Sequence, residues 1–384
     1  MHMRHRLHAR RSIIAIAIVT LLGLCAAACS SGSSSGSASS GGNSSGSTTA
    51  SGKYVIALSN SFIGNPWRKG MIAAWTSDAQ QAKAAGTISN YEVETTPENT
   101  ATAQIAQINN MILQHVNAID IDPASPTALN PVITKACNAG ITVVVFDSVA
   151  TAPCEYNLYN SFADYGTALA KEVATALNGK GNIIVAHGIV GTGSDTVSTN
   201  ASLAELKKYP GIKVVATING GGSPDTTQAA LAAVLPSLGP VNGVIDQTGT
   251  AGVFAAFQAA QRPLPAAVFG SDGQSLQIWS GLVKKDPQYA GNAAQSDPGQ
   301  GSAAFWESVA LLQKQKVSGQ SIPHNLIFPI LTIDNSSLPQ WLSAVPASGI
   351  GYYIWTQQEV LAGIADNLAN KPVPQPPVPT TQLQ

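Results

Sequence analysis

The sequence predicts an α/β fold made of two doubly wound lobes, each with a parallel β-sheet. Apolar, β-branched runs of strand length alternate with helical segments, as in right-handed βαβ units around a parallel sheet. This alternation restarts after the polar residues Tyr159-Asn160-Ser161. A chain of 384 residues is also too long for one ordinary core. Two α/β lobes in series, joined near Asn160, are the economical interpretation.

The first lobe opens on a strand, a polar turn and a helix. The run from Tyr54 to Leu58 is apolar or aromatic throughout, which suits a strand covered on both faces. After the break at Pro66, apolar side chains recur four residues apart from Trp67 onward, and this favours a helix that stops at Gly86. Further strands are predicted at 91–95, 118–122 and 141–146, with helices from about 100 and from about 129 to 140.

The second lobe repeats the pattern with its own strands. A helix near 163–177 leads through Gly179-Lys180-Gly181 into a strand at 182–186. Ala- and Leu-rich helices separate the further strands predicted at 212–216, 243–245 and 267–270. This set is long enough for a sheet of its own.

Both ends of the chain differ from the middle. Four early arginines precede a short apolar run at 13–24, which is typical of a secretory signal and predicts an exported protein. The sequence Ala26-Ala27-Ala28-Cys29 resembles the lipobox of bacterial lipoproteins, although Ala26 stands where Leu is commonest; ordinary cleavage near Ala28 is the alternative. Residues 30–52 form a Ser/Gly-rich tether, and the Pro-rich tail 371–384 is expected to be disordered.

Composition narrows the function classes. The net charge is -1, with no basic stripe beyond the extreme N-terminus, which argues against nucleic-acid binding. Cys137 and Cys154 remain in the exported part, where a lone pair is most simply a disulfide worth about 3 kcal/mol in the chain-entropy model. A free or metal-binding pair is the alternative, but no His or second Cys lies at ligand spacing.

The turn at Asn65-Pro66-Trp67 resembles the first strand-to-helix loop of the type I periplasmic sugar-binding proteins, the ribose-binding family. The resemblance covers roughly residues 53–330 and implies a three-strand hinge. The chain would cross near Asn160, near Gln295 and near Leu331. The implied first lobe comprises 53–160 and 297–330, and the implied second lobe comprises 161–296 and 331–370.

Candidate site residues are identified by their position after the predicted strands and by the resemblance to the family. Ligands of open α/β sheets bind beyond the carboxyl ends of the strands, which is where Ser61, Asn65, Trp67 and Arg68 are expected. The family places a carboxylate from each lobe on ligand hydroxyls and a glutamine at the second crossing. The matching residues here are Asp147, Asp272 and Gln295.

This chain departs from the ribose-type pattern at the discriminating positions. Ser148 stands where the family has one arginine, and Ser198 is the residue nearest to the position of a second. The expected Asn-Asp pair is replaced by a segment that contains Thr248. Loss of two guanidinium groups removes fixed donor forks, so ribose-like binding is not expected. Pentose, hexose, polyol and non-sugar ligands remain open.

The resemblance implies the ligand-binding component of an ABC importer. It would be lipid-anchored at the outer face of the cell membrane, monomeric and without a cofactor or bound metal. It would carry a small sugar or polyol to a membrane permease. An extracellular hydrolase is the alternative, with His187 and Ser194 as candidates, but no Gly-x-Ser-x-Gly elbow surrounds Ser194. A ligand-binding component of a sensor system is a third possibility.

Overall fold

The computed structural model describes residues 53–247, 249–289 and 291–383. The expected signal segment, the lipidation residue Cys29 and the Ser/Gly-rich tether lie outside the described residues. Within the described part of the chain, no helix combines the length and the apolar character needed to cross a membrane.

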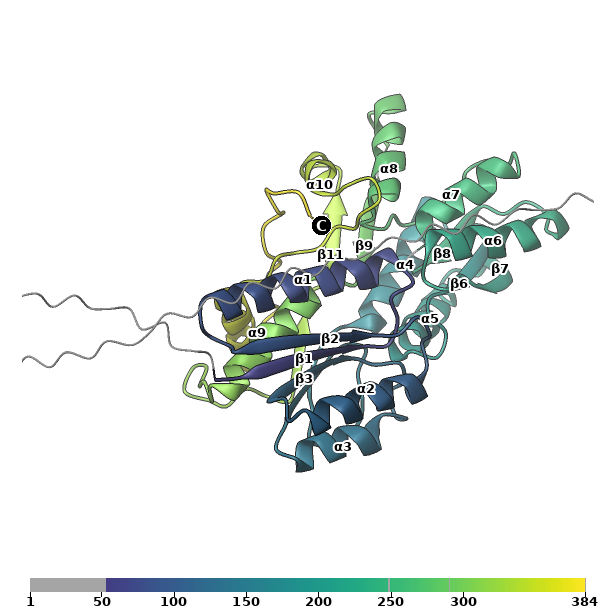
Figure 1. Ribbon diagram of the computed structural model, residues 1–384. Helices are drawn as coiled ribbons and strands as arrows, with labels where there is room; N and C mark the ends of the chain where they lie inside the picture. The colour runs from purple at the N-terminus through teal and green to yellow at the C-terminus, as the bar shows by residue number, and fades with distance from the viewer. Residues whose placement is uncertain (1–52, 248, 290, 384) are drawn as a thin grey trace, which may run out of the picture. The chain divides into compact units, whose positions relative to one another are not determined.

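The first lobe has a six-stranded sheet in which every pair is parallel, in the order β10-β5-β4-β3-β1-β2. Helices α1 and α9 pack on one face, and α2 and α3 pack on the other (Figure 1). The predicted βαβ alternation is confirmed, because successive strands lie parallel with a helix between most of them. The elements are β1 (Val55–Asn60), α1 (Pro66–Ala84), β2 (Asn90–Thr95), α2 (Ala101–Leu113), β3 (Ala118–Asp122), α3 (Asn130–Asn138), β4 (Thr142–Asp147), β5 (Tyr156–Asn160), α9 (Gln300–Leu312) and β10 (Asn325–Phe328).

The second lobe is centred on β6, which pairs in parallel with β7 and β8. The strand expected at 267–270 makes only single bridges, from Ala266 to Gly243 and from Phe269 to Ala293. β9 and β11 form a separate antiparallel pair. The elements are α4 (Phe162–Ala176), β6 (Lys180–His187), α5 (Gly193–Leu206), β7 (Gly211–Asn219), α6 (Pro224–Val234), a 3-10 turn (Leu235–Ser237), β8 (Gly243–Asp246), α7 (Thr250–Ala259), α8 (Gly273–Lys285), β9 (Asn292–Gln295), β11 (Leu331–Asp334) and α10 (Leu338–Ala344). Helix α11 (Gln357–Leu368) follows α10 in the chain but packs on the first lobe.

The chain passes between the lobes after β5, after β9 and between β10 and β11, and it returns to the first lobe between α10 and α11. Asn160, at the first of these crossings, donates from Nδ2 to the carbonyls of Phe328 (2.8 Å) and Pro329 (2.9 Å) at the third. Gln300 Nε2 donates to Asn160 Oδ1 at 2.5 Å. One buried amide therefore ties two crossings to helix α9.

The C-terminal part differs from the expected course in two ways. Helix α11, expected in the second lobe, packs against α9 and β10 of the first, because Val360 and Ile364 are buried there. The tail at 371–383, expected to be disordered, packs on the protein: Val373 is 8% exposed and Leu383 is 5% exposed. Proline fixes φ, so this segment loses little backbone freedom when its apolar side chains dock.

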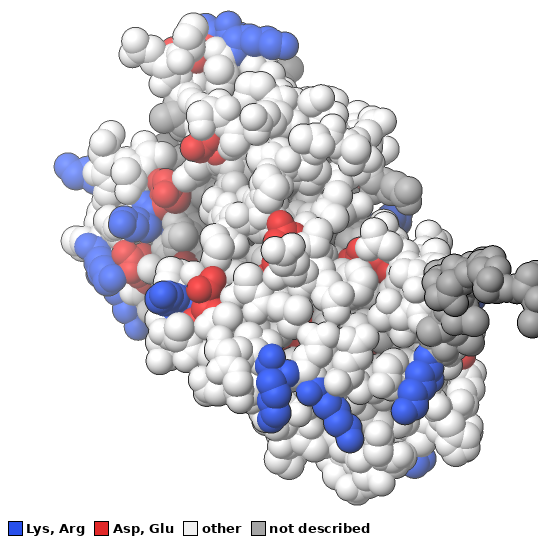
Figure 2. Space-filling model, turned by 90° about the vertical axis from the view of Figure 1, so that its left-hand side faces the viewer, with Lys and Arg blue, Asp and Glu red and all other residues white. Residues whose placement is uncertain are grey.

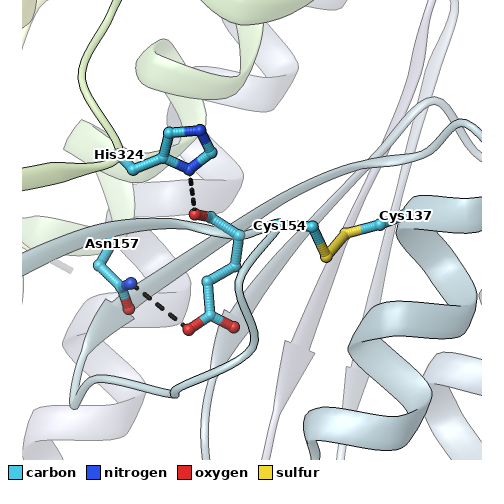
Figure 3. The surroundings of a disulfide bond; sticks show 5 residues. Cys137, Cys154, Asn157 and His324 are labelled. Carbon is cyan, nitrogen blue, oxygen red and sulfur yellow. Dashed lines mark hydrogen bonds between the residues drawn. A yellow bond between two sulfur atoms is a disulfide. The ribbon is translucent and has the colours of Figure 1, made fainter.

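The predicted disulfide is confirmed between Cys137 on α3 and Cys154 in the loop before β5 (Figure 3). Next to it, His324 Nδ1 donates to the carbonyl of Glu155 at 2.6 Å, and Asn157 Nδ2 donates to Glu155 Oε1 at 3.4 Å. The bond therefore fixes the loop that leads into the strand of the first crossing.

Removing this disulfide is expected to lower stability and to leave the cleft intact. Replacing Cys137 and Cys154 together with serine should lower the free energy of unfolding by about 3 kcal/mol, because the open loop regains conformational freedom in the unfolded chain. Urea denaturation of the variant, beside the reduced and oxidised parent, measures the change. A variant as stable as the oxidised parent would contradict the prediction.

Candidate ligand-binding site

The N-terminus of α1 is built by its cap. Asn65 has extended backbone angles and precedes Pro66 at the first helical position, a pairing that favours helix initiation. Its Oδ1 accepts from Arg68 N at 2.8 Å. Its Nδ2 donates to the carbonyl of Gly222, which follows β7 in the second lobe, at 3.0 Å. The cap residue thus also joins the two lobes.

A cavity lies between the lobes at this helix end, and Trp67 and Arg68 line it. Trp67 is 5% exposed and donates from Nε1 to the Ser296 carbonyl at 2.8 Å, at the second crossing. The Arg68 guanidinium lies 5.4 Å from the centre of the Trp67 ring. The indole is therefore held rigidly by a hydrogen bond and a cation-π contact.

The Arg68 guanidinium is paired with buried side chains of the first lobe. Its Nη1 forms an ion pair with Asp122 and donates to Asn60 Oδ1 at 2.9 Å. Burial lowers the pKa of Arg68 to about 10, and the nearby Asp147 carboxylate opposes that shift. The residue remains a cation at neutral pH, and its Nη1 is already paired with Asp122 and Asn60.

Asp147 is the carboxylate that lines the cavity. It ends β4 with a left-handed φ of 61°, which turns its side chain at the carboxyl edge of the sheet. Burial raises its pKa to about 6, and Arg68 and a hydrogen bond with Ser296 oppose the shift. Among the described residues, its buried Oδ1 has no hydrogen-bond partner. A hydroxyl in the cavity could donate to that oxygen.

The second lobe contributes an uncharged wall to the cavity. Tyr165 donates from its hydroxyl to the Gln247 carbonyl at 2.7 Å, which fixes one aromatic ring against the loop after β8. Aromatic faces, hydroxyls and one amide make up most of this wall: Phe162, Tyr165, Ile189, Thr192, Ser194 and Gln247. Such a surface offers C–H contacts and neutral hydrogen bonds.

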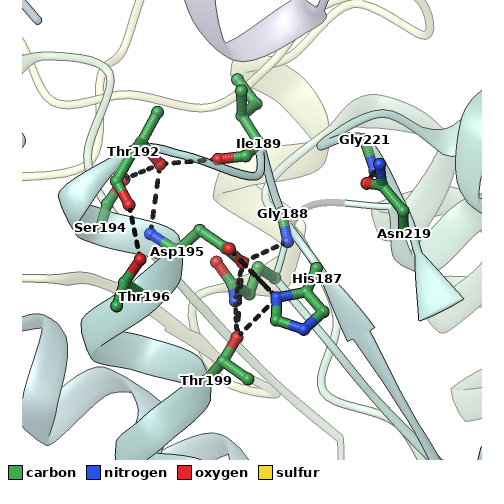
Figure 4. A network of polar contacts seen from close by, with 11 residues as sticks. His187, Gly188, Ile189, Thr192, Ser194, Asp195, Thr196, Thr199, Asn219 and Gly221 are labelled. Carbon is green, nitrogen blue, oxygen red and sulfur yellow. Dashed lines mark hydrogen bonds and ion pairs between the residues drawn. The ribbon is translucent and has the colours of Figure 1, made fainter. Parts of the chain in front are cut away.

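A polar network around Asp195 holds this wall in place (Figure 4). The Asp195 carboxylate accepts from Gly188 N at 2.8 Å, from Gln247 Nε2 at 3.0 Å and from His187 Nδ1 at 3.0 Å. Thr192 caps α5 by accepting from Asp195 N at 3.3 Å. The carboxylate therefore positions the cavity loop at 188–192, which is a structural role.

The geometry does not assemble a serine hydrolase. Ser194 Oγ lies 3.0 Å from Ser148 Oγ and 3.1 Å from Thr192 Oγ1. The His187 ring faces Asp195 and Thr199. Nucleophilic catalysis needs the serine and the base within hydrogen-bond reach of each other, and here both are engaged elsewhere.

Of the predicted site residues, the structure brings Asn65, Trp67, Arg68 and Asp147 together around the cavity. Ser148 makes a contact between the lobes through Ser194. The remaining predicted residues are absent from the cavity lining, and Thr248 lies outside the described residues.

These remaining residues are nevertheless buried. Asp272 caps α8 by accepting from Ser275 N at 2.9 Å. Gln295 Oε1 accepts from Ser271 N at 3.1 Å, while its Nε2 has no partner within the described part of the chain. Ser61 and Ser198 likewise have hydroxyls without a partner among the described residues. Their roles as ligand contacts remain predictions.

Sequence reasoning missed most of the second-lobe wall. Tyr165 and Phe162 lie in the first turn of α4, directly after the first crossing, and were treated only as part of a helix. The aromatic spacing next to the polar stretch at 159–161 was the available signal. In the loop at 188–192, Gly188, Ile189 and Thr192 also line the cavity.

Comparisons with known proteins agree with this architecture. Residues 56–316 match the model of a periplasmic binding protein domain. An ABC transporter solute binding protein from Thermobispora bispora is similar at 40% identity and a TM-score of 0.80, over 86% of this chain and 100% of that one. The xylitol-binding protein of Mycolicibacterium smegmatis is 27% identical over 244 residues, 62% of this chain and 67% of its own length.

A further structure shares the fold at lower identity. The ABC transporter solute binding protein from Bacillus halodurans, solved with bound myo-inositol, is 19% identical with a TM-score of 0.64, over 76% of this chain and 98% of that one. The domain match spans more than half of the sequence, so the chain belongs to the periplasmic binding protein family.

Proposed function

We propose that this chain is the solute-binding component of an ABC importer and closes its lobes on a neutral, hydroxyl-rich ligand such as a sugar or polyol. One observation carries the ligand class: Asp147 lines a cavity walled by both lobes, and its buried Oδ1 has no hydrogen-bond partner among the described residues. A hydroxyl that donates to this oxygen would form one of the stronger hydrogen bonds available to a neutral ligand. The similarity to a xylitol-binding protein and the myo-inositol bound in the Bacillus halodurans structure support this class.

Charge around the cavity argues against an anionic ligand. Arg68 is the only cationic side chain among the described residues that line it, and its Nη1 is already paired with Asp122 and Asn60. Asp147 adds negative charge to the same wall. A sugar phosphate or sugar acid would therefore meet repulsion without a free cation to offset it.

Residues of both lobes line the cavity, so a ligand in it would contact both lobes and favour their closure. A ligand stabilises the closed lobes only through contacts that exist in that state. Asn65, Trp67 and Asp147 lie on one side, with Tyr165 and Gln247 on the other. We include Gln295 as a further contact, because its unpartnered Nε2 is one residue away from Ser296 of the cavity wall. The same arrangement predicts binding without chemical change to the ligand.

The proposal includes a setting at the outer face of the cell membrane. Cys29 would carry the lipid, the Ser/Gly-rich segment would act as the tether, and a monomer would deliver its ligand to the permease. Uncharged side chains make up most of the face in Figure 2, with acidic and basic groups in small separate clusters.

A thermal-shift experiment on residues 52–384 tests the ligand class. Xylitol, myo-inositol and D-arabinose represent the neutral class, and gluconate and ribose 5-phosphate represent the anionic class. At 100 times its dissociation constant, a ligand should add about 2.7 kcal/mol to the folded state. We expect a raised melting temperature with at least one neutral compound and none with the anions. A shift with anions alone would contradict the assignment, and a ligand recovered chemically altered would contradict the binding role.

A further inference from the structure

The C-terminal residues 371–383, here called the strap, run from the first lobe to the second (Figure 1). At its start, Val373 is buried against α11 and β10, so closely that a Cβ on Gly363 would lie 3.1 Å from it. At its end, Leu383 is buried and its N–H donates to the carbonyl of Ala344, the last residue of α10, at 2.8 Å. Helix α10 packs on α8 and β11 of the second lobe. The strap therefore connects the two lobes, in addition to the predicted crossings.

The middle of the strap is attached to the hinge itself through Gln375. Its Nε2 donates to the carbonyl of Ile330, between β10 and β11, at 2.7 Å and to Thr332 Oγ1 at 3.0 Å. Its Oε1 accepts from the Tyr353 hydroxyl at 2.6 Å. Tyr353 lies in the segment that returns from α10 to α11. Its N–H donates to Asp297 Oδ1 at 3.0 Å, just after the second crossing. One side chain therefore links the third crossing to this returning segment.

The composition of the strap makes it stiff. Prolines occupy five of its thirteen positions: Pro372, Pro374, Pro376, Pro377 and Pro379. Each fixes its φ angle, and such segments behave as semi-rigid spacers. A spacer docked at both ends and at the hinge resists a change in the distance between those points.

The same structure holds the lobes in contact across the cleft. Asn65 Nδ2 donates to the Gly222 carbonyl at 3.0 Å, and Ser194 N donates to Ser148 Oγ at 3.0 Å. The strap contacts and the cleft contacts therefore coexist. Opening of the cleft changes backbone angles at the crossings, which would move Ile330 and Tyr353 relative to Gln375.

We infer that the strap is a conformational restraint that favours the arrangement with the lobes in contact. It thereby sets the fraction of unliganded protein that is ready to bind. This inference rests on the proposed solute-binding function for its consequence, but the restraint acts without ligand. Apparent affinity is proportional to the binding-ready fraction. Loosening the strap therefore weakens every ligand by the same factor, whereas a change at a ligand contact affects ligands unequally.

The test compares two glutamines of the strap. Gln375→Ala removes the hinge attachment, and Gln382→Ala alters an exposed residue of the same segment as the matched control. Small-angle X-ray scattering of the unliganded proteins should show a larger radius of gyration for Gln375→Ala only. Calorimetry with xylitol and with myo-inositol should show affinities lowered by one common factor, about three- to tenfold.

A conservative variant separates the restraint from general damage. Tyr353→Phe removes only the hydroxyl that donates to Gln375 Oε1, so it should change the scattering in the same direction and by less. An unchanged radius of gyration in a folded Gln375→Ala protein would overturn the inference, and so would unequal losses for the two polyols. If neither polyol binds the parent protein, the assigned ligand class fails, while the scattering comparison still decides the role of the strap.

Discussion

Replacing Asp147 with asparagine is expected to lower ligand affinity by about tenfold to a hundredfold, with the fold intact. The carboxylate would accept a charge-assisted hydrogen bond at Oδ1, which has no protein partner among the described residues. Asparagine keeps the size of the side chain and tolerates the left-handed backbone at this position. Arg68 retains Asp122 as its counter-ion, so the substitution does not leave a buried cation alone.

Calorimetry of Asp147→Asn beside Asp164→Asn measures the effect. Asp164 is an exposed carboxylate in the first turn of α4, and its loss should leave affinity unchanged. The pH dependence provides a second readout. Burial raises the pKa of Asp147 to about 6, so affinity in the parent should fall as pH drops below about 6 and stay level above it. A folded Asp147→Asn protein with parental affinity would remove Asp147 from the site.

The first half of this site could be predicted from sequence because it is local. The cap at Asn65, the helix that starts at Pro66 and the carboxylate that ends β4 all depend on neighbours in the chain. Local chemistry fixes where each of these groups lies at the edge of its sheet. The disulfide between Cys137 and Cys154 could also be predicted, because the only two cysteines of the expected exported domain most simply pair with each other.

The second half depends on how separate segments meet. Whether Tyr165 faces ligand or core is decided by the position of the loop after β8, to which its hydroxyl donates. Asp272 illustrates the same limit, because its carboxylate caps α8 and the sequence alone does not show whether it also reaches the cavity. The packing of α11 and of the Pro-rich strap was not predictable from composition, because burial of Val373 and Leu383 requires partners distant in sequence.

The protein is expected to be less stable at pH 8 than at pH 5, which is the second large effect. Burial raises the pKa of Asp78 and Asp120 to about 7 and that of Asp297 to about 6. Burial also raises the pKa of Glu307 well above its ordinary value, and neither carboxylate oxygen of Glu307 has a hydrogen-bond partner in the described part of the chain. These groups lie in the interior, where an ionised carboxylate is poorly solvated.

The direction of this change in stability is set by the number of protons that the folded and unfolded states bind. Between about pH 4 and pH 7 the folded protein retains protons on these groups that the unfolded chain, with ordinary carboxyl pKa values, has already released. The folded state then binds more protons, so the free energy of unfolding falls as pH rises through that window and levels off above it. For Asp120 alone, a rise in pKa from 3.8 to about 7 corresponds to about 4 kcal/mol.

Asp120→Asn is the variant that isolates this effect. Asp120 accepts from Trp75 Nε1 at 2.7 Å and from the Ser308 hydroxyl, and asparagine can keep the first bond and reverse the second. Urea denaturation at pH 5 and pH 8 should show a smaller loss of stability for this variant than for the parent. Asp334→Asn is the control. Hydrogen bonds with Ser336 and Ser337 hold the pKa of Asp334 at about 2, so this carboxylate is ionised at both pH values. Its replacement should leave the change in stability between pH 5 and pH 8 as it is in the parent. A parent protein that gains stability from pH 5 to pH 8 would mean that the buried carboxylates are stabilised as anions. The unpartnered oxygens of Glu307 would then need a donor that the described residues do not supply.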